Sequence, residues 1–167
     1  MSTKATSPTP ATSARPDGAA APRLSVIGTG YLGATHAAAM AALGFEVAGF
    51  DTDASKIAAL SLGKVPFFEP GLGELMTAQV DSGRLRFTAD VRDAVAGASV
   101  HFVCVGTPQQ ATSHAANLSY VEQAVTDITR NLTVDSLIVG KSTVPVGTAA
   151  RLRAALEAFN ATGDRSA

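Results

Sequence analysis

Short apolar runs and longer stretches with apolar residues at helical spacing alternate along the chain. The short runs predict buried strands at residues 24–28, 45–50, 85–88, 100–105 and 137–141. The longer stretches predict helices at 31–43, 53–62, 72–82, 90–96, 118–131 and 147–159. Strands that alternate with helices in this way form a parallel sheet with helices on both faces.

The predicted fold class is therefore α/β, a Rossmann-type doubly wound parallel sheet. The full dinucleotide-binding fold has six strands and this pattern supplies five, so we expect the sixth strand to be missing. Residues 1–22 are mainly Ser, Thr, Ala and Pro, and we interpret them as a disordered leader before a folded domain at 23–160 and a polar tail at 161–167. The strand at 137–141 then becomes an uncovered apolar edge, which predicts marginal stability or self-association.

Composition narrows the possible partners. The 167 residues are 46% hydrophobic, enough for a core, and their net charge of −1 gives nucleic acid or an anionic membrane no electrostatic attraction. No apolar run approaches the length of a membrane span and the N-terminus has no apolar signal segment, so we expect a cytoplasmic protein. The single cysteine excludes an internal disulfide and any multi-cysteine metal site.

A glycine-rich turn joins the first predicted strand to the first helix. The segment LSVIGTGYLG at 24–33 has its glycines in the pattern G-x-G-x-x-G. Gly28 permits the tight turn, Gly30 lets the backbone approach a pyrophosphate, and Gly33 lets the helix pack closely on the sheet. Free N–H groups at the helix start then face the anion. The predicted cofactor contacts in this turn are Gly28, Thr29, Gly30, Tyr31, Leu32 and Gly33.

The second predicted strand ends in Asp51, about twenty residues after the glycines, where the dinucleotide-binding fold places the acid that binds a ribose diol. Strand, turn, helix, strand and acid thus fall in order. This order favours dinucleotide binding over an ordinary βαβ unit whose glycines serve turns only. A carboxylate repels a 2′-phosphate, so Asp51 favours NAD over NADP.

Four further segments resemble the N-terminal domain of the UDP-glucose/GDP-mannose dehydrogenase family. They are DTDASK at 51–56, PFFEPGL at 66–72, VGTP at 105–108 and KSTVPVGT at 141–148. The resemblance covers about 24–158, nearly all of the folded chain. The KSTVPVGT segment is more similar to the UDP-glucose branch than to the branches for GDP-mannose or UDP-N-acetylmannosamine.

Two of these segments lie at the carboxyl ends of predicted strands, along the crevice where an open parallel sheet binds its ligand. Gly106 and Thr107 can offer backbone and a hydroxyl to a ribose or nicotinamide. By the resemblance, Thr107 and Ser142 contact NAD, and Thr143 is the catalytic residue that holds a water beside the reacting carbon. Turn or cap chemistry is the alternative for these hydroxyls. The predicted NAD contacts here are Val105, Gly106, Thr107, Pro108, Ser142 and Thr143.

Lys56 and Glu69 are charged residues of the other two segments. By the resemblance, Lys56 approaches the cofactor beside the adenosine ribose, and a solvated helix lysine is the alternative. Glu69 stands in a loop rich in Pro and Phe, where we expect a local cap or hydrogen bond and no catalytic role.

Cys104 is the only thiol, and by the resemblance the family uses a cysteine that forms a covalent thiohemiacetal and then a thioester. Cys104 lies within the apolar run VHFVCV, so we interpret it as a buried packing residue. The histidines show no ligand spacing with one another or with Cys104, and no metal site is expected. We expect His36 on a helix face, His101 packed at a strand start and His114 on an exposed loop.

The resemblance implies the oxidation of a nucleotide sugar's C6 alcohol to an acid with reduction of two NAD. It also implies a glutamate segment, a lysine, an asparagine and a nucleophilic cysteine beyond the matched segments. We therefore expect the NAD-binding portion of an enzyme of the UDP-glucose type, which binds NAD, takes a UDP-sugar only if the missing domains are supplied, and does not turn over alone. A non-catalytic nucleotide-binding module and a dehydrogenase of GDP-mannose or UDP-N-acetylmannosamine stay open. The EPGL and KSTVPVGT segments disfavour an FAD or NADP protein of another Rossmann family.

Overall fold

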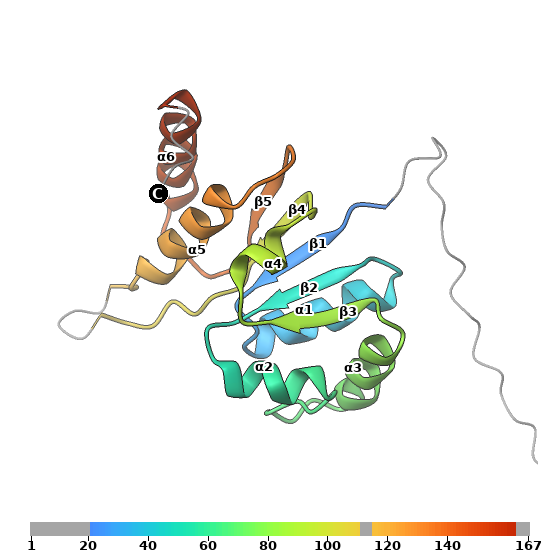
Figure 1. Ribbon diagram of the computed structural model, residues 1–167. Coiled ribbons are helices and arrows are strands. Elements are labelled where there is room, and N and C mark those ends of the chain that lie inside the picture. Colours follow the sequence, from blue (N-terminus) through green and yellow to red (C-terminus); the bar gives the residue numbers. More distant parts are fainter. Residues whose placement is uncertain (1–20, 111–114, 163–167) are drawn as a thin grey trace, which may run out of the picture.

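The computed structural model describes residues 21–110 and 115–162, in which a parallel sheet lies between two layers of helices (Figure 1). The strands are β1 (Leu24–Ile27), β2 (Val47–Phe50), β3 (Leu85–Thr88), β4 (Val100–Val103) and β5 (Leu137–Gly140). They form one five-stranded sheet in the order β3-β2-β1-β4-β5, with every neighbouring pair parallel. This arrangement confirms the predicted doubly wound α/β class.

The helices fall where the sequence predicted them, with small differences at their ends. They are α1 (Tyr31–Ala42), α2 (Ala54–Ser61), α3 (Leu72–Asp81), α4 (Val91–Val95), α5 (Ser119–Arg130) and α6 (Thr148–Thr162). Two of the starts are capped by aspartates: the Asp53 carboxylate accepts N–H bonds at the start of α2, and the Asp90 carboxylate does so for α4. The last helix continues past the predicted end at 159.

Each face of the sheet has its own core, because successive residues of a strand point to opposite sides. Leu24 and Val26 of β1 belong to a cluster with α1, α2 and α3. Ile27 of the same strand belongs to a cluster with α4, α5 and α6. The three N-terminal helices therefore cover one face and the three C-terminal helices the other, as Figure 1 shows.

The strand β5 forms one edge of the sheet and pairs with β4 alone within the described residues. Its first residue, Leu137, is 59% exposed. The edge position agrees with the sequence, and self-association through it stays a prediction. Residues 1–20, His114 and the last residues of the predicted tail, 163–167, lie outside the described residues. None of the helices in the described part is long and apolar enough to cross a membrane.

Candidate functional site

A cleft of about 440 Å³ opens at the carboxyl ends of β1, β2 and β4. Its walls are the turn after β1, the end of β2, the loop after β4, and α5. The chain runs outward from β1 to β2 and β3 on one side and to β4 and β5 on the other, so the cleft lies at the switch point where open α/β sheets bind ligands. Its volume is in the usual range for small-molecule sites.

The glycine turn forms the floor of this cleft. Gly28 has φ +94°, and a Cβ there would lie 2.9 Å from the Val105 backbone. A Cβ on Gly33 would lie 1.8 Å from the carbonyl oxygen of Gly28, so the fold itself requires the first and third glycines. A Cβ on Gly30 would meet nothing within 4 Å, which leaves open space above the turn. Since no side chain caps the start of α1, the turn fits an incoming pyrophosphate.

Asp51 is held in place on the cleft wall by three residues. Its Oδ2 atom accepts hydrogen bonds from the Thr29 backbone N–H at 2.9 Å and from Lys56 Nζ at 2.8 Å. Its Oδ1 atom accepts the Asp53 N–H at 3.1 Å. Burial alone would raise the pKa of Asp51, but these hydrogen bonds and the Lys56 charge lower it below its usual value. The carboxylate is therefore ionised and oriented before any ligand arrives.

The predicted site residues divide between those in the cleft wall and those beside it. Lining the cleft are Gly28, Gly30, Asp51, Lys56, Val105, Gly106 and Pro108. Outside its lining are Thr29, Tyr31, Leu32, Gly33, Thr107, Ser142 and Thr143. The Thr29 side chain is buried and donates to Asp51, so it orients the acid. The Ser142 hydroxyl donates to the Val105 carbonyl at 2.7 Å, and Thr143 is exposed. Contact of these two residues with NAD stays a prediction.

One face of α5 completes the cleft, and the sequence analysis did not assign it to the site. Its lining residues are Tyr120, Gln123, Ala124 and Asp127. Their spacing places them on one side of a helix. Two features of the sequence could have assigned this face to the site: the spacing of the four residues and the position of the helix after the loop that follows β4. Helices that follow such loops border the crevice at the carboxyl ends of the strands.

Glu69 makes the expected local hydrogen bond through its backbone carbonyl, which accepts the Leu72 N–H, but its side chain bonds a distant residue. Glu69 Oε2 accepts a hydrogen bond from the hydroxyl of Tyr31, the first residue of α1, at 2.7 Å. The ring of Phe67 meets the Tyr31 ring edge-on, with centroids 5.1 Å apart. The loop before α3 thus reaches back to the start of the helix that borders the glycine turn.

Cys104 and two of the histidines are packing residues. Cys104 is 7% exposed, and burial raises the pKa of its thiol to about 11. His101 is fully buried with its Nδ1 atom 2.7 Å from the Ser25 hydroxyl oxygen, and burial lowers its pKa to about 4. His36 lies on α1 with its ring against Phe102. Among residues 21–110 and 115–162, no three His, Cys, Asp or Glu side chains lie close enough to hold a metal.

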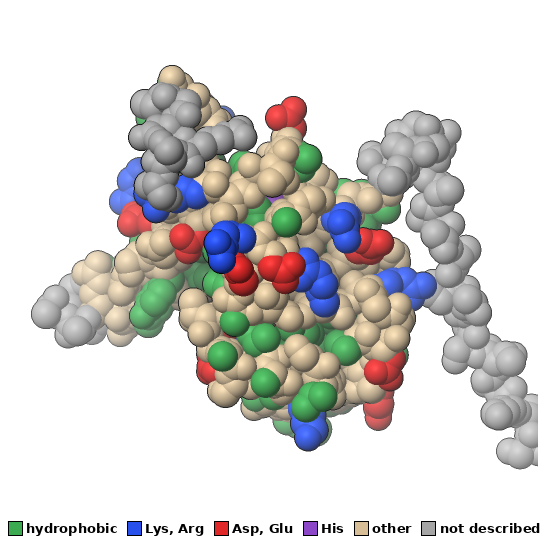
Figure 2. Space-filling view, viewed as in Figure 1, with side chains coloured by type: hydrophobic (Ala, Val, Ile, Leu, Met, Phe, Trp, Pro, Cys, Tyr) green, Lys and Arg blue, Asp and Glu red, His purple; other side chains and the backbone are tan. Residues whose placement is uncertain are grey.

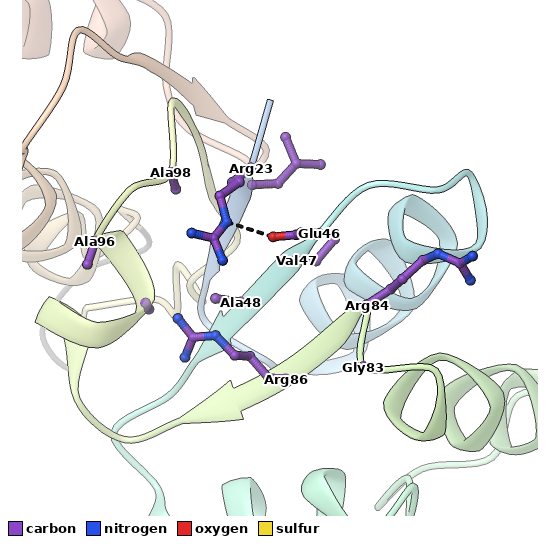
Figure 3. A pocket seen from close by; sticks show the side chains of 11 residues that line it. Arg23, Glu46, Val47, Ala48, Gly83, Arg84, Arg86, Ala96 and Ala98 are labelled. Atoms are coloured by element: carbon purple, nitrogen blue, oxygen red, sulfur yellow. Dashed lines mark hydrogen bonds and ion pairs between the residues drawn. The ribbon is translucent and has the colours of Figure 1, made fainter. Parts of the chain in front are cut away.

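A second, smaller hollow of about 50 Å³ lies at the amino ends of the strands (Figure 3). Three arginines border it, but Arg23 pairs with Glu46 and Arg86 pairs with Asp93. Basic and acidic side chains also lie next to one another on the face in Figure 2. This hollow is too small for a nucleotide and most of its charge is already paired, so it is not the candidate site.

Comparisons with known proteins show which family the chain is similar to. The sequence model of the UDP-glucose/GDP-mannose dehydrogenase family, NAD binding domain, matches residues 22–165. UDP-glucose 6-dehydrogenase of Rhizobium meliloti is 42% identical over 142 residues, which are 85% of this chain and 32% of that protein. GDP-mannose 6-dehydrogenase of Azotobacter vinelandii is 40% identical over 129 residues, covering 75% of this chain and 29% of that protein. A UDP-glucose dehydrogenase structure from Pyrobaculum islandicum superposes with a TM-score of 0.80 and 39% identity, covering 89% of this chain and 35% of that one. The chain thus spans about a third of the length of these relatives.

Proposed function

The chain belongs to the UDP-glucose/GDP-mannose dehydrogenase family and contains its NAD-binding domain, and on this basis we propose that it is the cofactor-binding part of a UDP-glucose 6-dehydrogenase. In this proposal the 167 residues bind NAD and do not oxidise the sugar by themselves. NAD, when bound, accepts hydride from the substrate carbon. The protein's task is to hold and orient it.

The ionised Asp51 at the rim of the glycine turn is the observation that carries the proposal. An ionised carboxylate accepts both hydroxyls of a ribose diol, while the open space above Gly30 and the uncapped start of α1 accept the pyrophosphate. Lys56 bonds Asp51 from the cleft wall and holds it toward the ribose position. The apolar walls from Val105 and Ala124 offer a surface for the adenine.

The absence of turnover is proposed from the only thiol in the sequence. Cys104 is buried against α1, and its raised pKa leaves almost no thiolate near neutral pH. A covalent step on sulfur therefore needs a cysteine from another polypeptide segment. Purified chain supplied with UDP-glucose and NAD should form no NADH, measured as absorbance at the NADH band. Formation of UDP-glucuronate by the chain alone would refute this part of the proposal.

The sugar nucleotide is assigned from the KSTVPVGT segment, which resembles the UDP-glucose branch. The relative that acts on GDP-mannose is nearly as similar, at 40% identity against 42%. GDP-mannose is therefore the second candidate. Joining this chain to the remaining part of a UDP-glucose relative and of a GDP-mannose relative, then assaying both sugars with each chimaera, separates the two.

Titration with NAD, NADP and FAD tests cofactor binding directly. Calorimetry should show NAD binding more tightly than NADP, because the Asp51 carboxylate repels a 2′-phosphate. FAD should bind weakly or not at all. Tighter binding of NADP or FAD would overturn the assignment.

A further inference from the structure

Tyr31 stands between the glycine turn and the loop at 64–71. Tyr31 begins α1, whose start has no side-chain cap, but its side chain does not line the cleft and is 55% exposed. In the structure the Tyr31 side chain lies against the loop. Tyr31 directly follows Gly30, where an added Cβ would meet no other part of the chain within 4 Å.

The observed position is fixed by two contacts from the loop. The Tyr31 hydroxyl donates to Glu69 Oε2 at 2.7 Å, and the Tyr31 ring meets Phe67 edge-on at 5.1 Å. The loop is itself anchored, because Phe67 packs on the core beneath α1 and α3. The Leu72 N–H also donates to the Glu69 carbonyl at 3.1 Å. The backbone that carries the Glu69 side chain is therefore held in place by the loop's own contacts.

We propose that Glu69 is a positioning residue for NAD binding: it holds the Tyr31 ring against the loop and so keeps the pyrophosphate turn open. This inference rests on the proposed function, since it concerns the same cleft. Without the carboxylate, Tyr31 regains side-chain rotamers that the ligand must then exclude. Ordering one such side chain on binding costs a factor of about three to ten in affinity.

The charge of Glu69 opposes this benefit and allows the two effects to be separated. A carboxylate near the turn repels the pyrophosphate weakly across a water-exposed surface. A glutamine keeps an acceptor for the Tyr31 hydroxyl and removes the charge. Glu69→Gln should therefore bind NAD as tightly as the wild type or slightly more tightly, whereas Glu69→Ala should bind it more weakly.

Calorimetric titration of the full chain with NAD and with adenosine is the test. Glu69→Ala and Tyr31→Phe should each weaken NAD binding about three- to tenfold, and the double variant should be no weaker than either single one. Adenosine lacks the pyrophosphate, so its affinity should not change. Phe68→Ala is the matched control, because Phe68 is the adjacent loop residue, is 89% exposed, and should leave NAD binding unchanged.

A spectroscopic signal reports on the contact itself. The sequence has no tryptophan and two tyrosines, so in a Tyr120→Phe background Tyr31 alone contributes to the tyrosine absorbance titration. The hydrogen bond to Glu69 raises the pKa of Tyr31, and Glu69→Ala should return it toward its ordinary value. Glu69→Gln should retain NAD affinity while removing the carboxylate's charge from this titration.

Wild-type affinity in Glu69→Ala, or a loss in Glu69→Gln equal to that in Glu69→Ala, overturns the inference. A loss of adenosine binding in parallel with NAD also overturns it, because that result indicates general damage to the domain. If the wild-type chain binds adenosine but not NAD, the proposed function fails first, and the inference fails with it.

Discussion

The two ends of the same sheet differ in what they leave available to a ligand. At the carboxyl ends, glycines expose backbone to a cleft of about 440 Å³, and the Asp51 side chain is 11% exposed. At the amino ends, arginines and acids surround a hollow of about 50 Å³, and the paired Arg23 and Glu46 side chains are 60% and 64% exposed. Paired charges on the exposed surface therefore do not by themselves form a ligand site. A partly buried charge beside exposed glycine backbone offers a ligand both a charged partner and free backbone groups.

The polarity of a parallel sheet explains the difference. Every strand leads into its helix at the carboxyl end, so helix starts with their free N–H groups gather there. At the other end the chain returns from helix C-termini, and its polar side chains stay in solvent.

Gly33→Ala should destabilise the domain by about 3 kcal/mol or more and abolish NAD binding, because the new Cβ would fall within 1.8 Å of the Gly28 carbonyl oxygen. The amino-end counterpart is Gly83, with φ +74° and nothing within 4 Å of an added Cβ. Gly83→Ala should cost about 1 to 2 kcal/mol from backbone strain alone and leave NAD affinity intact. Urea denaturation and NAD titration measure both effects.

Gly30→Ala separates folding from binding at the carboxyl end. Its Cβ would meet no protein atom, so stability should change by less than about 1 kcal/mol, while the methyl group occupies the approach of the pyrophosphate. If Gly30→Ala bound NAD normally, the cleft would not be the pyrophosphate site. If Gly33→Ala folded as stably as the wild type, the tight packing of the turn would be disproved.

His101 should make stability fall as the solution becomes acidic. Its pKa is about 4 in the folded protein and near its usual 6.5 in the unfolded chain, so between these values the unfolded chain takes up the proton and the folded chain does not. Stability is complete above about pH 6.5 and declines toward pH 4, by at most about 3 kcal/mol. The lowered pKa of Asp51 also makes stability fall with acidification, but only at lower pH, near and below the usual pKa of an aspartate.

The measurement is the urea midpoint from pH 7.5 to 4.5 for the wild type and His101→Gln. The variant should lose most of this slope, whatever its absolute stability. His36→Gln is the control, since the pKa of His36 is lowered by burial and by Lys141 and should contribute a smaller slope of the same sign. An unchanged slope in His101→Gln would exclude His101 as the cause.

The fold and the glycine turn could be predicted because they follow from local rules. Strand and helix periods are visible in neighbouring residues, and Gly33 is required by its contact with Gly28 inside one βα unit. The pattern G-x-G-x-x-G also identifies Gly28, although its close contact is with Val105 after β4. The partners of Glu69 and the face of α5 could not be predicted in this way. The hydrogen bond from Tyr31 to Glu69 joins residues separated by 38 positions. The α5 face of the cleft depends on how that helix packs against a neighbouring strand. Such contacts depend on packing between elements, which periodicity does not specify.

Asp51→Asn should weaken NAD binding about tenfold, because the amide makes weaker hydrogen bonds to a ribose diol than the carboxylate does. It should weaken NADP binding less or improve it, since the repulsion of the 2′-phosphate disappears. Glu46→Gln, the paired acid at the amino end, should leave both affinities unchanged. Equal losses for the two cofactors in Asp51→Asn would exclude Asp51 as the residue that selects NAD.

The smallest expected effects come from two ion pairs of almost equal length. Arg23 and Glu46 are 2.7 Å apart, and Lys56 and Asp51 are 2.8 Å apart, but their side chains are 60% and 64% exposed in the first pair and 27% and 11% in the second. Arg23→Gln should change the free energy of unfolding by less than about 0.5 kcal/mol, since water screens the exposed pair. Lys56→Gln should cost about 1 kcal/mol and become more harmful to NAD binding at low salt, because it leaves the Asp51 charge without its cation. If urea denaturation gave equal losses for the two variants, distance and not burial would determine the strength of these pairs, and the contrast between the two ends of the sheet would not hold.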